Sequence, residues 1–192
     1  MPTRQLFATG FYEGALGDDA LIGELDDACR DLAVEDKAGR AWSRAHGYRG
    51  YTSYASLNDL PARDPRFADL VRRLDRHVAG FAKDCGFELG KRLRLDSLWV
   101  NVLKPGGTHS GHLHPHSAVS GTVYIAVPPG SGALKLEDPR LPMLMAAPAR
   151  PDTFVYAEPS AGSVFLWESW LRHEVMPNAA KAERVSISFN YR

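Results

Sequence analysis

The hydrophobic pattern of this 192-residue chain changes its period once, near Leu93. Before that point apolar residues recur at helical spacing, whereas beyond it they alternate with polar residues, and Pro and Gly clusters separate the runs. Helices followed by seven or eight short strands predict a mainly β fold with flanking helices, of the α+β class. The length suits a single domain, 1–192, in which residues 1–90 supply a lead-in strand and supporting helices and residues 91–192 the β core.

The pattern also predicts where the elements lie. A lead-in strand is expected within residues 6–12, helices over 18–34 and 65–85, and strands over 95–103, 119–127, 133–137, 153–157, 163–168 and 184–191. Residues 40–63 and 139–151 are predicted to be irregular. Their aromatic and methionine side chains lead us to expect that both segments frame the mouth of a pocket.

Composition and charge exclude several classes of function. Lys plus Arg equals Asp plus Glu at 23 each, so we expect no nucleic-acid partner. The chain has no apolar run long enough to span a bilayer and no secretory pattern at its start, and it has two cysteines, Cys29 and Cys85, which are expected to be small buried hydrophobic residues. We therefore expect a cytoplasmic protein without a membrane partner. A homodimer is left open.

Histidines are concentrated in one short window. Four of the seven lie within residues 109–116, and in an extended strand His112, His114 and His116 would share a face. An H-x-H pair on a strand aims two imidazole nitrogens at one point, which indicates a metal site. The best third ligand is His173, which follows an apolar strand. We expect His116 to lie near the site or in the substrate pocket and His109 at the surface.

The last predicted strand has one polar face. Arg184, Ser186, Ser188 and Asn190 point one way, and this strand directly follows His173, so the polar face is expected beside the metal. An inward arginine must be paired, and a planar guanidinium suits a carboxylate, with Ser186 as an added donor. By the same alternation Asn101 is a polar residue on an inward face of the strand before the histidines.

The sequence resembles the Fe(II)/2-oxoglutarate-dependent oxygenases, in particular a bacterial branch with an H-x-H…H motif. The resemblance rests on G-H-L-H-P-H-S-A-V-S-G-T-V-Y over 111–124 and on W-L-R-H-E-V over 170–175 followed by R-V-S-I-S-F-N over 184–190. It implies a double-stranded β-helix, a jelly-roll or cupin-like barrel, with His112 and His173 as Fe(II) ligands. It also implies that Arg184 and Ser186 bind the distal carboxylate of 2-oxoglutarate, with Asn101 and Tyr124 as further cosubstrate contacts.

The family activity then implied is hydroxylation of a small-molecule or peptide substrate, with release of succinate and CO2. One position departs from the family pattern, because His114 stands where the family has Asp or Glu. A carboxylate from Glu137, Asp138 or Glu168 is the alternative third ligand. Two other functions stay open: a cupin-type three-histidine metalloenzyme that does not use 2-oxoglutarate, and a non-catalytic metal- or ligand-binding β-barrel.

Overall fold

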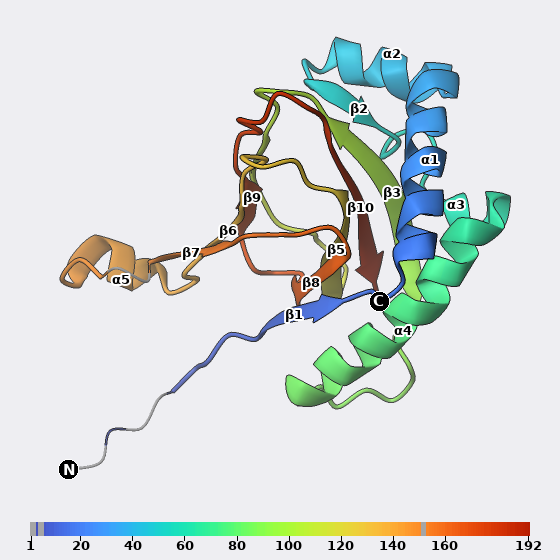
Figure 1. Cartoon of the computed structure of the whole chain (residues 1–192). Helices are drawn as coiled ribbons and strands as arrows, with labels where there is room; N and C mark the ends of the chain where they lie inside the picture. The colour runs from blue at the N-terminus through green and yellow to red at the C-terminus, as the bar shows by residue number, and fades with distance from the viewer. Residues whose placement is uncertain (1–2, 4–5, 151–152) are drawn as a thin grey trace.

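The computed structural model describes residues 3, 6–150 and 153–192 (Figure 1). The N-terminal part holds β1 (Phe11–Ala15), α1 (Asp19–Glu35), α2 (Lys37–Ala45), β2 (Gly50–Thr52), α3 (Leu60–Arg63) and α4 (Pro65–Asp84). The C-terminal part holds β3 (Leu95–Leu103), β4 (His109–His112), β5 (Val119–Ala126), β6 (Leu134–Glu137), α5 (Leu141–Ala146), β7 (Phe154–Ala157), β8 (Ser163–Glu168), β9 (His173–Val175) and β10 (Arg184–Tyr191). The predicted change from helices to strands therefore falls between α4 and β3.

The strands form two antiparallel sheets. The larger sheet has the order β1-β8-β5-β10-β3-β2, and the smaller sheet has the order β4-β9-β6-β7. β10 lies inside the larger sheet, hydrogen-bonded to β3 on one side and to β5 on the other. The prediction of a mainly β fold with flanking helices is confirmed, and closure of the sheets into a barrel stays a prediction.

Two long helices cover one face of the larger sheet (Figure 1). Asp18 caps α1 by accepting a hydrogen bond from the Leu21 amide at 3.0 Å, and α4 begins at Pro65, directly after its cap Asp64. Their apolar stripes pack with alternate residues of β10; the cluster includes Leu25, Leu70, Leu74, Val185, Ile187 and Phe189. Each such side chain contributes about 1.5–3 kcal/mol when buried. Within the described ranges, no helix has the length and hydropathy needed to cross a membrane.

The prediction that residues 40–63 are irregular was wrong, because α2, β2 and α3 occupy most of that range. The helix α2 turns Gly39 and Ser43 toward the interior, so it carries no apolar stripe that a periodicity argument could detect. It is held instead by the carboxylate of Asp36, which accepts hydrogen bonds from the Gly39 amide at 3.0 Å and from the Tyr51 hydroxyl at 3.0 Å.

Three smaller expectations can also be compared with the structure. The lead-in strand begins at Phe11 rather than Leu6, and residues 139–151 contain α5, with Pro151 outside the described residues. Cys29 is buried, Cys85 is half-buried, and both are free thiols. The expectation of buried cysteines therefore holds for Cys29, whereas Cys85 is partly exposed.

Candidate metal centre

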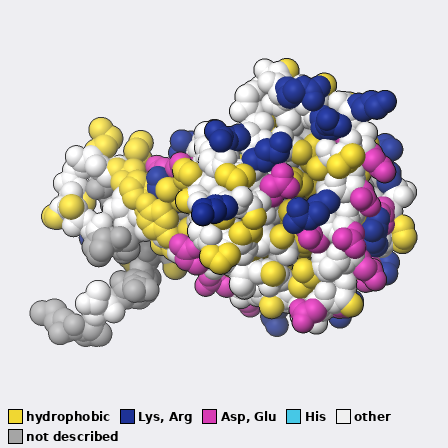
Figure 2. Space-filling model, turned by 45° about the horizontal axis from the view of Figure 1, so that its top comes forward, with side chains coloured by type: hydrophobic (Ala, Val, Ile, Leu, Met, Phe, Trp, Pro, Cys, Tyr) yellow, Lys and Arg dark blue, Asp and Glu magenta, His cyan; other side chains and the backbone are white. Residues whose placement is uncertain are grey.

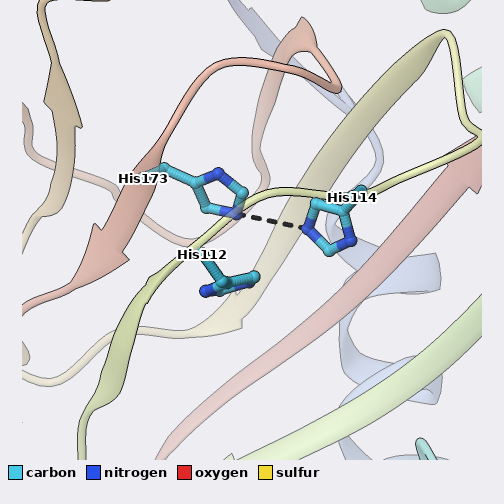
Figure 3. Close-up of side chains that lie close together, drawn as sticks. All are labelled: His112, His114 and His173. Carbon is cyan, nitrogen blue, oxygen red and sulfur yellow. Dashed lines mark hydrogen bonds between the residues drawn. The ribbon is translucent and has the colours of Figure 1, made fainter. Parts of the chain in front are cut away.

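Three histidine side chains lie close together at one end of the smaller sheet (Figure 3). His112 is the last residue of β4, His173 is the first residue of β9, and the two are direct neighbours in the sheet register. His114 lies two residues beyond β4. One ring nitrogen from each of the three lies within 4.8 Å of the others. His173 also packs on Trp167 of the larger sheet, with ring centroids 4.6 Å apart, which places the histidine cluster between the sheets.

Hydrogen bonds to the backbone orient two of these rings. Nδ1 of His112 lies 2.7 Å from the Ser110 carbonyl oxygen, and Nδ1 of His173 lies 2.9 Å from the Leu171 carbonyl oxygen. A carbonyl can only accept, so each Nδ1 carries the proton and each Nε2 keeps a free lone pair. Nε2 of His173 lies 3.2 Å from Nε2 of His114. Such an arrangement presents ring nitrogens to a common point, as in a metal site.

Burial keeps two rings of the cluster uncharged, those of His114 and His173. Burial, and next the neighbouring His112, lowers the pKa of His173 to about 3. The same two causes, in the same order, lower the pKa of His114 to about 4. Both rings are therefore neutral at pH 7, which is the form that binds a metal. Three imidazole side chains that converge in this way fit a divalent transition metal such as iron.

The carboxylates considered as a third ligand lie elsewhere. Glu137 accepts a hydrogen bond from Arg172 at 3.2 Å, Asp138 is paired with an arginine at 2.6 Å, and Glu168 accepts one from the Trp170 indole at 2.9 Å. Among the described residues none of these carboxylates belongs to the histidine cluster. His114 thus supplies the third group of the cluster.

The structure reverses the expected places of the two other histidines in the window. β4 ends at His112, so the predicted strand through His116 does not form, and His116 is exposed with a positive φ of 70°. His109 is not at the surface. It lines the same cavity as the three clustered histidines, and its Nε2 lies 2.6 Å from the Tyr48 hydroxyl. Pro115 ends the strand pattern, since a proline lacks the amide that a ladder needs.

Arg184, the first residue of β10, is almost fully buried, with 2% of its surface exposed. Its Nη1 donates to the carbonyls of Ser131 and Gly132 at 3.2 Å each, and its buried Nε has no partner among the described residues. Its guanidinium lies 5.8 Å from the centre of the Tyr124 ring. Burial lowers its pKa from the ordinary 12.5. Among the described residues this guanidinium has no carboxylate partner, which a buried arginine normally requires.

The other predicted cosubstrate residues lie on the same face of the larger sheet. Ser186 is buried and stands opposite Asn101 and Tyr124 in the register of β10 with its two neighbours. Asn101 accepts a hydrogen bond from Thr52 at 2.9 Å and donates one to Ser188 at 3.1 Å. The expected inward direction of the polar face of β10 is therefore observed.

A cavity of about 1120 Å³ opens beside the histidine cluster. Residues of the 40–63 segment line it, including Trp42, Tyr48, Thr52 and Tyr54, as we expected. No described residue of 139–150 lines this cavity, so the expectation for that segment was wrong. Those residues contribute instead to a second cavity of about 650 Å³ beside β1.

One site residue was missed at the level of the sequence. Trp167 lines the cavity, packs on His173, and has a buried Nε1 without a hydrogen-bond partner among the described residues. Alternation along β8 could have found it, because Phe165 and Trp167 share the face opposite to Val164 and Leu166.

The strands that carry this site match a known protein family. The model of a family described as "Putative 2OG-Fe(II) oxygenase" matches residues 97–190. That stretch runs from β3 to β10 and includes the histidine cluster and Arg184. The resemblance to the Fe(II)/2-oxoglutarate oxygenases is thereby confirmed. No curated protein sequence matches the chain.

Several solved structures share the fold of this one. A prolyl-4-hydroxylase from Pseudomonas putida has a TM-score of 0.67 at 18% identity, with 96% of this chain and 93% of that chain covered. HygX from Streptomyces hygroscopicus, solved with nickel and 2-oxoglutarate, has a TM-score of 0.63 at 17% identity, with 95% and 82% covered. A viral collagen prolyl hydroxylase from Paramecium Bursaria Chlorella virus-1, in complex with 2OG, has a TM-score of 0.58 at 12% identity, with 95% of each chain covered. The family model and the shared fold together indicate a 2-oxoglutarate- and Fe(II)-dependent oxygenase.

Proposed function

We propose that this oxygenase holds Fe(II) through His112, His114 and His173, in a cytoplasmic protein whose two sheets form a double-stranded β-helix. Support comes from the convergence of three ring nitrogens within 4.8 Å and from the backbone hydrogen bonds that place the proton of His112 and of His173 on Nδ1, so that Nε2 can bind a metal. Histidine at the third position leaves the ligand set without a negative charge.

We propose that the distal carboxylate of 2-oxoglutarate binds the guanidinium of Arg184, with Ser186 as a second donor and Asn101 and Tyr124 as further contacts. The observation that carries the proposal is the buried Nε of Arg184, which has no partner among the described residues. A dicarboxylate would supply the missing anion, and charge-assisted hydrogen bonds of this kind contribute about 1.5–3 kcal/mol each.

The protein residues then bind and orient the reactants. When bound, Fe(II) and 2-oxoglutarate supply the oxidising chemistry of the family, in which O2 is consumed, succinate and CO2 are released and the substrate is hydroxylated. Trp167 and the other buried side chains around His173 exclude water from the inner end of the cavity. Trp42 and Tyr54 stand farther out, where a small-molecule or peptide substrate would enter.

A cupin-type enzyme without 2-oxoglutarate is the second candidate, because a three-histidine set is the ligand set that such an enzyme would use. The buried Arg184 argues against it, since an enzyme that binds no dicarboxylate gains nothing from an unpaired guanidinium in its core.

An anaerobic titration separates the two functions. Metal-free protein is titrated with Fe(II) and then with 2-oxoglutarate, and the weak visible charge-transfer band of the iron chelate is followed. We expect the band in the wild-type protein, a loss of iron binding in His114→Ala, and normal iron binding without the band in Arg184→Ala.

The matched control is His116→Ala, which removes an exposed histidine of the same window and should change nothing. Iron binding without a band in the wild-type protein would favour the cupin-type enzyme. Failure to bind iron at all would leave a non-catalytic ligand-binding protein.

A further inference from the structure

Aromatic side chains lead from the histidine cluster to the mouth of the cavity. Trp99 lies 6.0 Å from the His114 ring, Tyr54 lies 5.2 Å from Trp99, and Trp42 lies 6.5 Å from Tyr54, measured between ring centroids. All three line the cavity, and we call them the aromatic wall. Trp99 is 7% exposed and Tyr54 is 54% exposed, so Tyr54 offers most of the free ring surface, whereas Trp42 is stacked on His46 with ring centroids 4.1 Å apart. Such a surface suits a flat ring, because aromatic pairs stack.

The sheet side of the cavity is polar but uncharged. Asn101 is hydrogen-bonded to Thr52 and Ser188, and Ser188 lies 3.2 Å from Thr122 through their hydroxyls. All four residues line the cavity. Because their polar groups already bond to one another, this side supplies orientation without favouring either sign of charge.

Fixed charge around the cavity is positive. Apart from histidines, the charged residues of its described lining are Arg49 and Asp96. The carboxylate of Asp96 is neutralised by the Arg192 guanidinium at 2.9 Å, whereas Arg49 forms no ion pair with any described residue. Arg49 therefore keeps its positive charge free at the mouth.

The neighbouring helix adds to this charge. The sequence of α2 carries Lys37, Arg40 and Arg44 and no acidic residue, and all three cations are exposed. Figure 2 turns this end of the molecule forward and shows Lys and Arg side chains gathered over its upper part. Although the whole chain has no net charge, a substrate that approaches over α2 meets a positive surface, which attracts anions.

The inner end of the cavity would also carry a net positive charge when Fe(II) and 2-oxoglutarate are bound. The two positive charges of Fe(II) cancel the two negative charges of 2-oxoglutarate, and the guanidinium of Arg184 is left over. In an oxygenase with a carboxylate ligand that ligand would balance the surplus, but here His114 occupies its place. This surplus adds to the positive potential of the cavity, which disfavours a cationic substrate.

We propose that the cavity binds a flat, ring-containing substrate that carries an acidic group, with its ring against the aromatic wall and its acidic group toward Arg49. The inference rests on the proposed function, because the same cavity borders the histidine cluster. Arg49 and Tyr54 become the residues that determine specificity.

Three probes that share one ring test the inference. Indole-3-acetate, indole-3-acetamide and tryptamine are anionic, neutral and cationic, and their affinities are measured by calorimetry on full-length protein with Zn(II) and saturating 2-oxoglutarate. We expect the acetate to bind roughly tenfold more tightly than the acetamide, and tryptamine to bind most weakly. Saturating 2-oxoglutarate prevents the acetate from binding Arg184 instead.

Variants assign the effect to residues. Arg49→Gln should reduce the affinity for the acetate to that for the acetamide and leave the acetamide unchanged. Tyr54→Ala should weaken all three probes by a similar factor. The matched control is Arg72→Gln, which removes an exposed arginine of α4 outside the cavity lining and should have no effect.

Three results would overturn the inference: equal affinities for the probes, tightest binding of tryptamine through cation–π contacts with the wall, or no binding of any probe. If Arg49→Gln still preferred the acetate as strongly as the wild-type protein does, Arg49 would not be the residue that binds the acidic group. The Fe(II) chelate band is recorded on the same preparations. A normal band without charge preference overturns this inference alone, whereas charge preference without a band overturns the proposed function alone.

Discussion

Arg184→Met should affect the protein in opposite directions with and without its cosubstrate. In the ligand-free protein Arg184 is 2% exposed, its Nη1 donates to two carbonyls at 3.2 Å, and its Nε has no partner among the described residues. Replacing buried charged groups by apolar ones of similar volume is often neutral or stabilising by about 1–4 kcal/mol. The loss of two hydrogen bonds offsets part of that gain, so we expect a net stabilisation of about 1 kcal/mol.

With 2-oxoglutarate bound, the wild-type protein should instead be more stable than Arg184→Met. Bound at 100 times its dissociation constant, 2-oxoglutarate would stabilise the wild-type protein by about 2.7 kcal/mol. Truncating one partner of a buried charge pair costs about 2–5 kcal/mol of binding energy, which is roughly 30- to 5000-fold in affinity. Arg184→Met should therefore be the more stable protein without 2-oxoglutarate and the less stable one with it.

Urea and thermal unfolding with Zn(II), in the presence and absence of 2-oxoglutarate, measure both effects. For a chain of this size 1 kcal/mol shifts Tm by about 2–4 °C. The matched control is Arg73→Met: Arg73 also has a buried Nε without a partner, but its Nη2 lies 2.7 Å from the Asp18 carboxylate. The control should lose stability and keep its response to 2-oxoglutarate. If Arg184→Met destabilised the ligand-free protein as much as the control does, the reasoning about an unpaired buried charge would be refuted.

Three further predictions concern stability. Asp36→Asn should lower the free energy of unfolding, measured by urea unfolding, by about 1–2 kcal/mol. It weakens the hydrogen bond that caps α2 and the two further hydrogen bonds that the Asp36 carboxylate accepts from Tyr51 and Ser56. Gly121→Ala should cost about 1–3 kcal/mol in the same assay, because its Cβ would lie 2.5 Å from Phe189 and 2.6 Å from Leu166; an unchanged midpoint would contradict this. Burial, and next the charge of a nearby arginine, lowers the pKa of His109 from 6.5 to about 3, so the unfolded chain binds a proton between these pH values that the folded protein does not. Metal-free protein should accordingly lose stability as the pH falls from 6.5 toward 3, and His109→Gln should flatten that dependence.

The sequence predicted the features that depend on regular alternation. The whole of β10 was placed correctly, including the inward direction of Arg184 and Ser186, because polar and apolar residues alternate along it although both of its faces are buried. The start of α1 was also predicted to within one residue, since Asp18 supplies a side-chain acceptor before an apolar stripe, which is a local feature.

Features that depend on tertiary contacts were missed. His109 was placed at the surface because its hydrogen-bond partner, Tyr48, lies 61 residues earlier in the chain. The strand through His116 was expected because alternation continues past His112, whereas the backbone turns at Pro115. The helix α2 is held by side-chain hydrogen bonds to Asp36, which leave no periodic trace in the sequence.

The position of β10 within the larger sheet has a kinetic consequence. Its neighbours β3 and β5 begin about 90 and 65 residues earlier, and they meet across β10 rather than with each other. Pairing over such separations carries a large loop-closure entropy, which slows folding. During synthesis β3 and β5 are finished long before the strand that joins them, so their hydrogen-bonding edges stay open to other chains in the meantime. Expression at lower temperature or with chaperones should accordingly raise the yield of correctly folded protein.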